Sequence, residues 1–177
     1  MRTRYQITEP EFPYFITSTI IEWLPIFTRK PYFDIVIDSL HYARQRKGLK
    51  LFAYVTMDNH IHLIAAGGNL AKIIGEFKSY AATQIVRLLQ EENRQWLLNQ
   101  LKFYKQGYKK ESHFQVWQEG FHPKQISSDE MLRQKIEYIH SNPVRAGFVE
   151  RAEDWLYSSA RNYLCGTGVS EIDVLDL

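Results

Sequence analysis

The spacing of apolar residues divides the chain into short strands and amphipathic helices. Residues 14–21 are rich in aromatic, β-branched and Thr side chains, which predicts a strand. From Tyr32 to Ala43 the apolar residues recur at helical spacing, and Gly48 is well placed to end that helix. The first part of the chain therefore predicts a strand followed by a helix with a basic end.

The middle of the chain predicts a hairpin and then a long helix. Residues 51–56 and 60–66 have strand character, with Asp58 and Asn59 as the tight turn between them. Asn69 is a plausible N-cap for a helix that carries one apolar stripe. The stripe comprises Leu70, Ile74, Phe77, Ala81, Ile85 and Leu88.

The last third predicts an irregular connection at residues 101–113, a short strand at 114–118 and another helix. Ser127 and Glu130 form a capping box at the start of that helix, and Ile126 and Met131 form a hydrophobic staple. The helix is expected to end near residue 142, because proline disfavours helical geometry in the residue before it. Strands and helices in this order, without repeats, indicate an α+β domain with a mostly antiparallel sheet.

Composition adds modest constraints. The 177 residues have a net charge of only +2, and the single cysteine, Cys165, excludes an intrachain disulfide and a multi-thiolate zinc site. We expect a cytoplasmic protein without a signal peptide or membrane span, because every apolar stretch is broken by polar residues. Three acidic residues lie beyond Ser170, so residues 1–170 carry +5; we expect a single domain over 1–165 and a partly loose acidic tail over 166–177.

The first candidate for chemistry is the His60-Ile61-His62 sequence on the second hairpin strand. Side chains alternate along a strand, so His60 and His62 share a face with Ile64 while Ile61 and Leu63 face the opposite way. Two imidazoles that point the same way suit a metal ion. A half-exposed strand that happens to carry two histidines explains the pattern equally well.

The second candidate is the helix before Pro143. Tyr138 and Asn142 are four residues apart and Lys135 lies one turn earlier, so a phenol, an amide oxygen and an ammonium group share one helix face. A packing role for Tyr138 and a capping role for Asn142 are the alternatives.

Together, these segments resemble a known family. The sequence from Met57 to Leu63 looks like the His-hydrophobic-His (HUH) motif of the single-tyrosine transposases. The sequence Tyr-Ile-His-Ser-Asn-Pro-Val-Arg-Ala-Gly-Phe-Val that begins at Tyr138 resembles the tyrosine helix of their REP-associated branch, and Trp-Leu-Tyr-Ser-Ser-Ala from Trp155 is similar to the segment that follows it there. The resemblance covers roughly residues 14–164.

The resemblance implies a ferredoxin-like HUH endonuclease that cuts single-stranded DNA near hairpins. His60, His62 and Asn142 would hold one Mg²⁺ or Mn²⁺ ion, and Tyr138 would form a 5′-phosphotyrosine link. A tyrosine phenol ordinarily has a pKa of about 10, so it must lose its proton as it attacks; Lys135 is our candidate for the positive charge that assists. Tyr80, with Gln84 four residues on, is a rival nucleophile, although its place beside the apolar stripe suggests packing.

A protein binds single-stranded DNA through cationic and aromatic side chains on its surface. Two basic clusters are candidates, and each is equally consistent with an ordinary solvated surface. One comprises Lys102, Tyr104, Lys105, Tyr108, Lys109 and Lys110, and the other comprises Arg44, Arg46 and Lys47.

Two departures from the family pattern stand out. Asp58 replaces the proline that many relatives have in the hairpin turn, and residues 11–14 lack a Gly-Thr motif, which leaves the recognised hairpin sequence open. A hairpin-binding protein without turnover and a His-ligated hydrolase of another phosphodiester are the alternative functions. Monomer and homodimer both remain open.

Overall fold

The computed structural model describes residues 7, 9, 12–107 and 112–175. One antiparallel sheet contains β1 (Tyr14–Thr19), β2 (Lys50–Thr56), β3 (His60–Ala66) and β4 (Lys124–Gln125) in the order β2-β3-β1-β4. The helices are α1 (Lys30–Lys47), α2 (Leu70–Glu91), α3 (Gln95–Phe103), α4 (Asp129–Arg145) and α5 (Ala160–Cys165), with short 3₁₀ turns η1 (Ile21–Trp23) and η2 (Ala152–Asp154).

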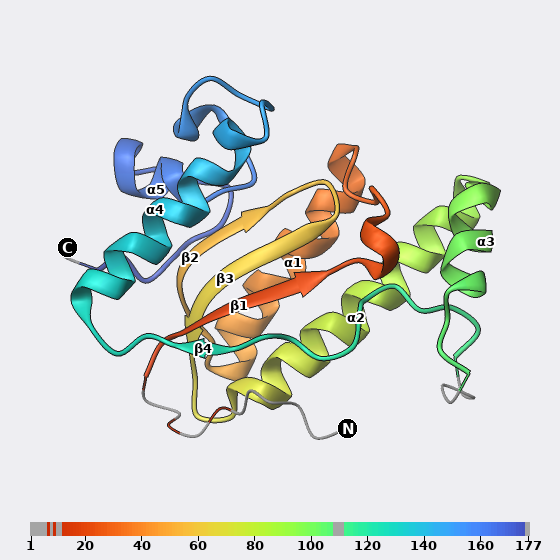
Figure 1. Cartoon of the computed structure of the whole chain (residues 1–177), viewed down its shortest axis with the longest axis horizontal. Coiled ribbons are helices and arrows are strands. Elements are labelled where there is room, and N and C mark those ends of the chain that lie inside the picture. Colours follow the sequence, from red (N-terminus) through yellow and green to blue (C-terminus); the bar gives the residue numbers. More distant parts are fainter. Residues whose placement is uncertain (1–6, 8, 10–11, 108–111, 176–177) are drawn as a thin grey trace.

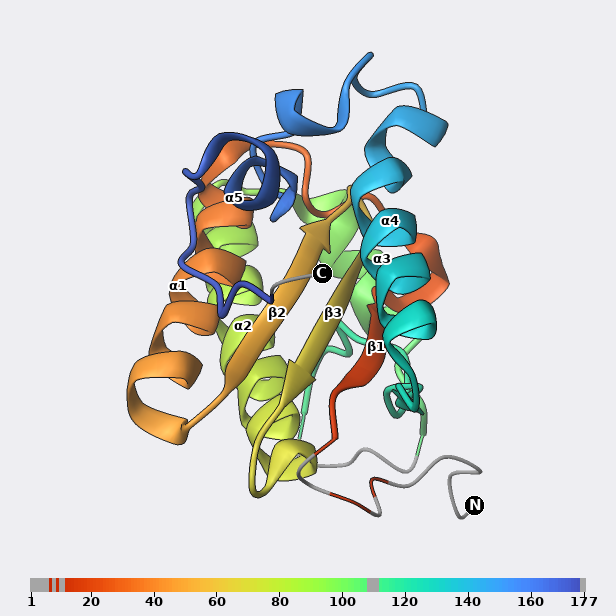
Figure 2. The same cartoon turned by 90° about the vertical axis from the view of Figure 1, so that its left-hand side faces the viewer.

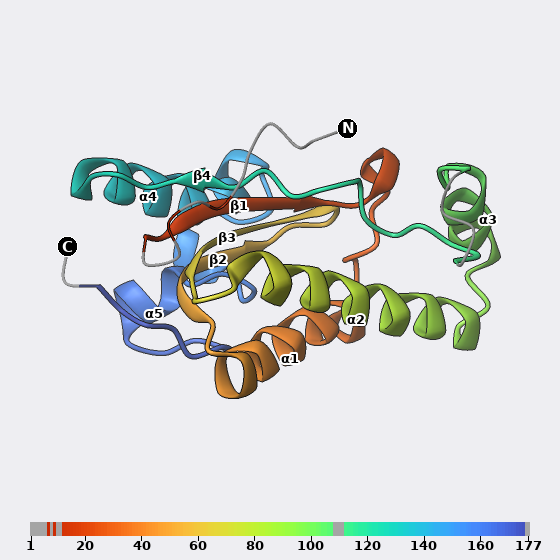
Figure 3. The same cartoon turned by 90° about the horizontal axis from the view of Figure 1, so that it is seen from below.

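The sheet separates two helical layers. Helices α1 and α2 lie on one face and α4 lies on the other, as Figures 2 and 3 show from two directions. This strand order and helix placement confirm the expected α+β, ferredoxin-like fold. The larger core lies between the sheet and α1–α2, and a smaller one lies under α4.

The β2–β3 hairpin has the predicted turn and the predicted division of faces. Ile61 and Leu63 belong to the core on the α1–α2 side, whereas Ile64 belongs to the core under α4. The alternation therefore directs His60 and His62 toward α4. The main-chain bond from Met57 N to His60 O, 2.8 Å, closes the turn.

Helices α1 and α2 follow the sequence prediction closely. Helix α1 begins at Lys30 with Pro31 in its first turn, and Gly48 ends it in the left-handed conformation at φ 72°. The predicted stripe of α2 ends at Leu88. In the structure Leu88 is only half-buried, and Leu89 is the last buried residue of the helix. Asn69 precedes α2 without a side-chain capping bond.

The predicted strand at 114–118 is wrong. In this segment only Trp117 pairs, in an isolated bridge with Ile20, and the fourth strand is β4. Around that bridge, Gln118 N donates to Thr19 O and Ile21 N donates to Val116 O, both at 2.8 Å, whereas Gln115 N donates to Leu101 O at 3.0 Å and the Trp117 indole donates to Lys78 O at 2.9 Å. The irregular connection predicted from residue 101 also starts too early, since α3 continues to Phe103.

Helix α4 differs from the prediction at both ends. Ser128, not Ser127, is the N-cap, and its hydroxyl accepts a bond from Met131 N at 3.2 Å. The helix continues through Pro143 to Arg145 instead of ending near Asn142. Gly147, at φ 75°, then allows a Schellman cap, in which Gly147 N bonds Val144 O and Phe148 N bonds Pro143 O, both at 2.9 Å.

The Tyr-Ser-Ser segment pairs with the free edge of β2. Thr56 N donates to Tyr157 O and Ser159 N donates to Tyr54 O, both at 2.9 Å. The Ser159 hydroxyl also contacts Tyr54 N at 3.0 Å and His140 Nε2 at 2.9 Å. The Tyr-Ser-Ser segment therefore joins β2 to α4 and has a structural role.

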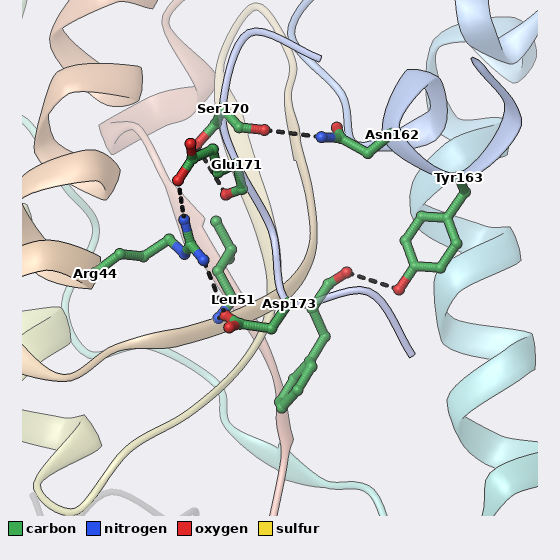
Figure 4. A network of polar contacts seen from close by, with 8 residues as sticks. Arg44, Leu51, Asn162, Tyr163, Ser170, Glu171 and Asp173 are labelled. Atoms are coloured by element: carbon green, nitrogen blue, oxygen red, sulfur yellow. Dashed lines mark hydrogen bonds and ion pairs between the residues drawn. The ribbon is translucent and has the colours of Figure 1, made fainter. Parts of the chain in front are cut away.

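The described part of the acidic tail is docked on the protein, contrary to the expectation of a partly loose end (Figure 4). The Asp173 carboxylate accepts a bond from Leu51 N at 2.8 Å, and Asp173 N donates to Leu51 O at 2.7 Å. Arg44 bridges Glu171 and Asp173 at 3.5 and 3.4 Å. Asp176 lies outside the described residues.

Within the ranges that the structure describes, no helix combines the length and apolar character needed to cross a bilayer.

Candidate functional site

Two imidazoles on β3 form the centre of the candidate site. The ring centroids of His60 and His62 are 4.7 Å apart. The His60 Nδ1 proton bonds the Asn59 side-chain oxygen at 2.7 Å, and His62 Nδ1 lies 2.9 Å from the Thr17 hydroxyl. Because both Nδ1 atoms have partners, both Nε2 atoms are left for a further ligand.

Burial keeps both imidazoles neutral. It lowers the pKa of His62 to about 3, with smaller contributions from His60 and Lys135, and it lowers the pKa of His60 despite the opposing charge of Asp58. The Phe15 ring stacks on His62 with centroids 5.2 Å apart, which adds to this desolvation. A neutral imidazole offers the lone pair that a metal ion requires.

Helix α4 brings Tyr138 to these histidines from across the sheet face. The Tyr138 and His62 ring centroids are 5.4 Å apart, and Phe15 meets Tyr138 edge-on at 5.9 Å. Tyr138 is still 36% exposed, so its phenol is supported by the core without being enclosed by it. The alternative that Tyr138 only packs in the core is therefore met in part, because part of its side chain stays exposed.

Two cations lie against the Tyr138 ring. The Lys135 ammonium is 5.6 Å from the Tyr138 centroid and 4.7 Å from that of Phe15, and the Arg145 guanidinium is 5.8 Å from the Tyr138 centroid. Arg145 reaches this position because α4 continues two turns beyond Tyr138. The continuation also keeps Asn142 helical, where its Nδ2 donates to Tyr138 O at 3.2 Å instead of capping the helix end.

An open pocket of about 540 Å³ joins these elements. Its walls come from η1, the β2–β3 turn, the second half of α4 and the loop after it. The functional side chains that line it are Trp23, His60, Tyr138, Asn142, Arg145 and Phe148.

The donor set fits a divalent metal ion. His60 lines the pocket, the neutral His62 ring lies next to it with centroids 4.7 Å apart, and Asn142 on the same pocket wall offers a harder oxygen donor. In the described part of the chain, no three His, Cys, Asp or Glu side chains gather into a metal site.

Tyr80 occupies a different place. It lies on α2, in the layer on the other face of the sheet, and lines a pocket with Tyr42, Lys47 and Glu76. The expectation that it packs into the core is wrong, since it is 55% exposed. The sheet separates its helix from the face that carries His60 and His62.

The basic cluster on α1 is separated from the pocket and is engaged in ion pairs. The Arg44 side chain is only 17% exposed and bonds the tail, and Lys47 pairs with Glu76 at 3.0 Å. Arg46 is exposed on the same helix end. All three belong to the α1–α2 layer.

The other cluster begins on α3, at the opposite end of the long axis from α4 (Figure 1). Lys102 is exposed on α3, and Tyr104 and Lys105 follow directly after it. Tyr108, Lys109 and Lys110 lie outside the described residues.

Three pocket or supporting residues are absent from the sequence prediction. Thr17 could have been predicted from the sequence, because alternation along the strand places it on the same face as Phe15, which is the face of the histidines. Arg145 reaches the pocket only because α4 continues past Pro143. Gly147, which can adopt the positive φ of a helix cap, is the residue that could have indicated this longer helix. Trp23 had no sequence signal beyond its aromatic character.

Comparisons with known proteins identify the family of the chain. The family model for IS200-like transposases matches residues 25–142. A REP-associated tyrosine transposase of Haemophilus influenzae is 34% identical over 111 residues, which are 60% of this chain and 56% of that protein, so the match spans little more than half of the relative.

Two solved structures are similar. A REP-associated tyrosine transposase bound to a REP hairpin has a TM-score of 0.64 and 19% identity, over all of this chain and 95% of that one. A transposase of Deinococcus radiodurans has a TM-score of 0.45 and 16% identity, over 78% of this chain and 95% of that one. The first confirms the fold. Since the family model matches well over half of its residues, this chain belongs to the IS200-like transposase family.

Proposed function

We propose that the protein is a metal-dependent single-stranded DNA endonuclease and strand transferase in which Tyr138 is the nucleophile. The observation that carries this proposal is the approach of Tyr138 on α4 to His62 on β3, with 5.4 Å between ring centroids at an open pocket. A phenol and two neutral imidazoles at one surface suit attack on a phosphodiester.

Tyr138 performs the transfer. Its phenol oxygen bonds to phosphorus as the P–O3′ bond breaks, its proton passes to solvent, and the released 3′ oxygen takes up a proton. The products are a 5′-phosphotyrosine link and a free 3′-hydroxyl, so the cut end stays on the protein for the second transfer. Lys135 and Arg145 stabilise the negative charge that develops on the phenol and the phosphate.

His60, His62 and Asn142 would hold the metal ion, for which we propose Mg²⁺ or Mn²⁺. When bound, it offsets charge on a phosphate oxygen and orients the phosphorus for in-line attack. Thr17 and Asn59 fix the orientation of the two imidazoles through their Nδ1 atoms.

We propose hairpin-bearing single-stranded DNA in the cytoplasm as the substrate. The support is the REP hairpin bound by the structural relative and the family of the sequence relative. The net charge of +5 on residues 1–170 favours a polyanion. Lys102, Tyr104, Lys105, Tyr108, Lys109 and Lys110 remain proposed contacts to a longer single strand. Arg46 is the exposed candidate on α1, because Arg44 and Lys47 have ion-pair partners.

The test is incubation with labelled hairpin-bearing single-stranded DNA and Mg²⁺ or Mn²⁺, followed by a denaturing gel. We expect a protein-linked fragment with the wild type and with Tyr80→Phe, and none with Tyr138→Phe or with His60→Ala plus His62→Ala. Cleavage without a linked fragment indicates a hydrolase, and hairpin binding without cleavage indicates a binding protein; either result overturns the proposal.

A further inference from the structure

Trp23 is an exposed aromatic side chain at the edge of the candidate site. It is 57% exposed, lines the same pocket as Tyr138 and Asn142, and meets the His60 ring edge-on with centroids 5.9 Å apart. An indole gains most from burial, so its exposure here is not explained by core packing.

The backbone that presents Trp23 is in an unfavourable conformation. Glu22 and Trp23 both have positive φ, 50° and 54°. Side chains other than glycine rarely adopt this region, and a bulky residue there is an outlier. Such strain persists only where the surrounding structure enforces it, and it concentrates at functional positions.

The surroundings enforce it through buried residues on both sides. Ile20, Ile21 and Leu24 are buried, and they flank the two strained residues. Ile20 N donates to Asn59 O at 2.9 Å, and Phe27 N donates to Asp58 O at 2.8 Å. The segment is thus bonded on both sides of Trp23 to the turn that carries His60, which fixes the indole relative to the site.

A second exposed aromatic residue contributes to the pocket from the other end of the chain. Phe148 is 43% exposed and is the last residue of the Schellman cap of α4, and its ring packs against Trp155 with centroids 5.3 Å apart. The pocket therefore combines aromatic surface with Arg145 and His60.

We propose that Trp23 is a stacking platform for an unpaired nucleobase next to the scissile phosphate. Every base has a flat face that can stack on an aromatic ring, and cationic side chains hold the adjoining phosphates. Trp23 would position the strand so that the phosphodiester meets Tyr138. This inference rests on the proposed function, because it assigns part of the same substrate to the same pocket.

Equilibrium binding separates stacking from catalysis. We would use the Tyr138→Phe variant without added metal, and measure fluorescence anisotropy with labelled dT12 and with a 12-unit abasic strand. The two strands have the same phosphates, so the ratio of their Kd values reports binding to bases. Trp23→Ala and Trp23→Phe are compared in that background. Trp96→Ala is the matched control, since Trp96 is 62% exposed on α3.

We expect Trp23→Ala to weaken dT12 binding about 5- to 150-fold while the abasic strand binds unchanged, which is the range for loss of one aromatic stack. Trp23→Phe should stay within about threefold of the parent, and Trp96→Ala should keep the parent ratio. An unchanged ratio in Trp23→Ala, or an equal loss in Trp96→Ala, overturns the stacking role. The adduct assay with Tyr138 intact reports separately on the proposed function.

Discussion

The Thr17 hydroxyl on β1 lies 2.9 Å from Nδ1 of His62, its cross-strand partner on β3. The same pairing that aligns the central strands therefore also orients the imidazole. Nδ1 of His62 is thus bonded to a residue whose position the sheet fixes, and Nε2 is left for a further ligand.

Thr17→Val should weaken metal binding without unfolding the protein. The valine keeps the shape of the side chain but loses the hydroxyl, and loss of such an outer partner typically lowers metal affinity about 10- to 100-fold. Titration calorimetry with Mn²⁺ measures the change. Thr83→Val is the control, because its hydroxyl bonds Ser79 O on the exposed surface of α2. Equal affinities in the two variants would exclude an orienting role for Thr17.

Lys135→Ala should slow adduct formation roughly tenfold, the effect of about 1.4 kcal/mol of lost charge stabilisation. Its ammonium is 5.6 Å from the Tyr138 centroid. Lys135→Arg should restore most of the rate because it keeps the charge. Arg133→Ala removes an exposed charge from the same helix and should leave the single-turnover rate intact. A rate for Lys135→Ala that matches Arg133→Ala would refute the assignment.

Trp23→Gly should be more stable than Trp23→Ala by about 1 kcal/mol. Both variants lose the indole, but only glycine relieves the positive φ, which costs other residues roughly 1–2 kcal/mol. Urea unfolding of the two variants gives the difference directly. If alanine is the more stable residue here, then the backbone at Trp23 is not strained, and the structural basis for its presentation fails.

Ser159→Ala should destabilise the protein by roughly 1–3 kcal/mol. The buried Ser159 hydroxyl contacts the main chain of Tyr54 and Nε2 of His140, and its removal takes a hydrogen-bond partner from both. Chemical denaturation measures the loss, and Ser79→Ala on exposed α2 surface is the comparison. DNA affinity of folded Ser159→Ala should match the wild type. Selective loss of binding at unchanged stability would instead place the Tyr-Ser-Ser segment in the DNA site.

Local patterns predicted the parts of the site that local geometry determines. Strand alternation placed His60 and His62 on one face, and helical spacing placed Tyr138 and Asn142 on another. That the two faces meet depends on α4 crossing the sheet opposite α1 and α2, which residue spacing does not encode. The family resemblance supplied that connection.

Long-range contacts explain what the sequence prediction missed. Arg44 has the character of a surface cation but pairs with Asp173, 129 residues later in the chain. Proline at 143 predicts a helix end, yet the cap formed by Gly147 stabilises one more turn. Residues 114–118 have strand composition, but they pair with the segment after β1 only at the Trp117 bridge, because Gln115 N is already bonded to Leu101 O on α3.

The measurement that tests the central claim most directly is identification of the tyrosine that carries DNA. After reaction with hairpin-bearing single-stranded DNA, nuclease trimming and trypsin digestion, Tyr138 lies on the peptide formed by residues 136–145 and Tyr80 lies on the peptide formed by residues 79–87. We predict a nucleotide mass on the 136–145 peptide alone, and none in Tyr138→Phe. A nucleotide on the 79–87 peptide, or cleaved DNA with neither peptide modified, would contradict the account.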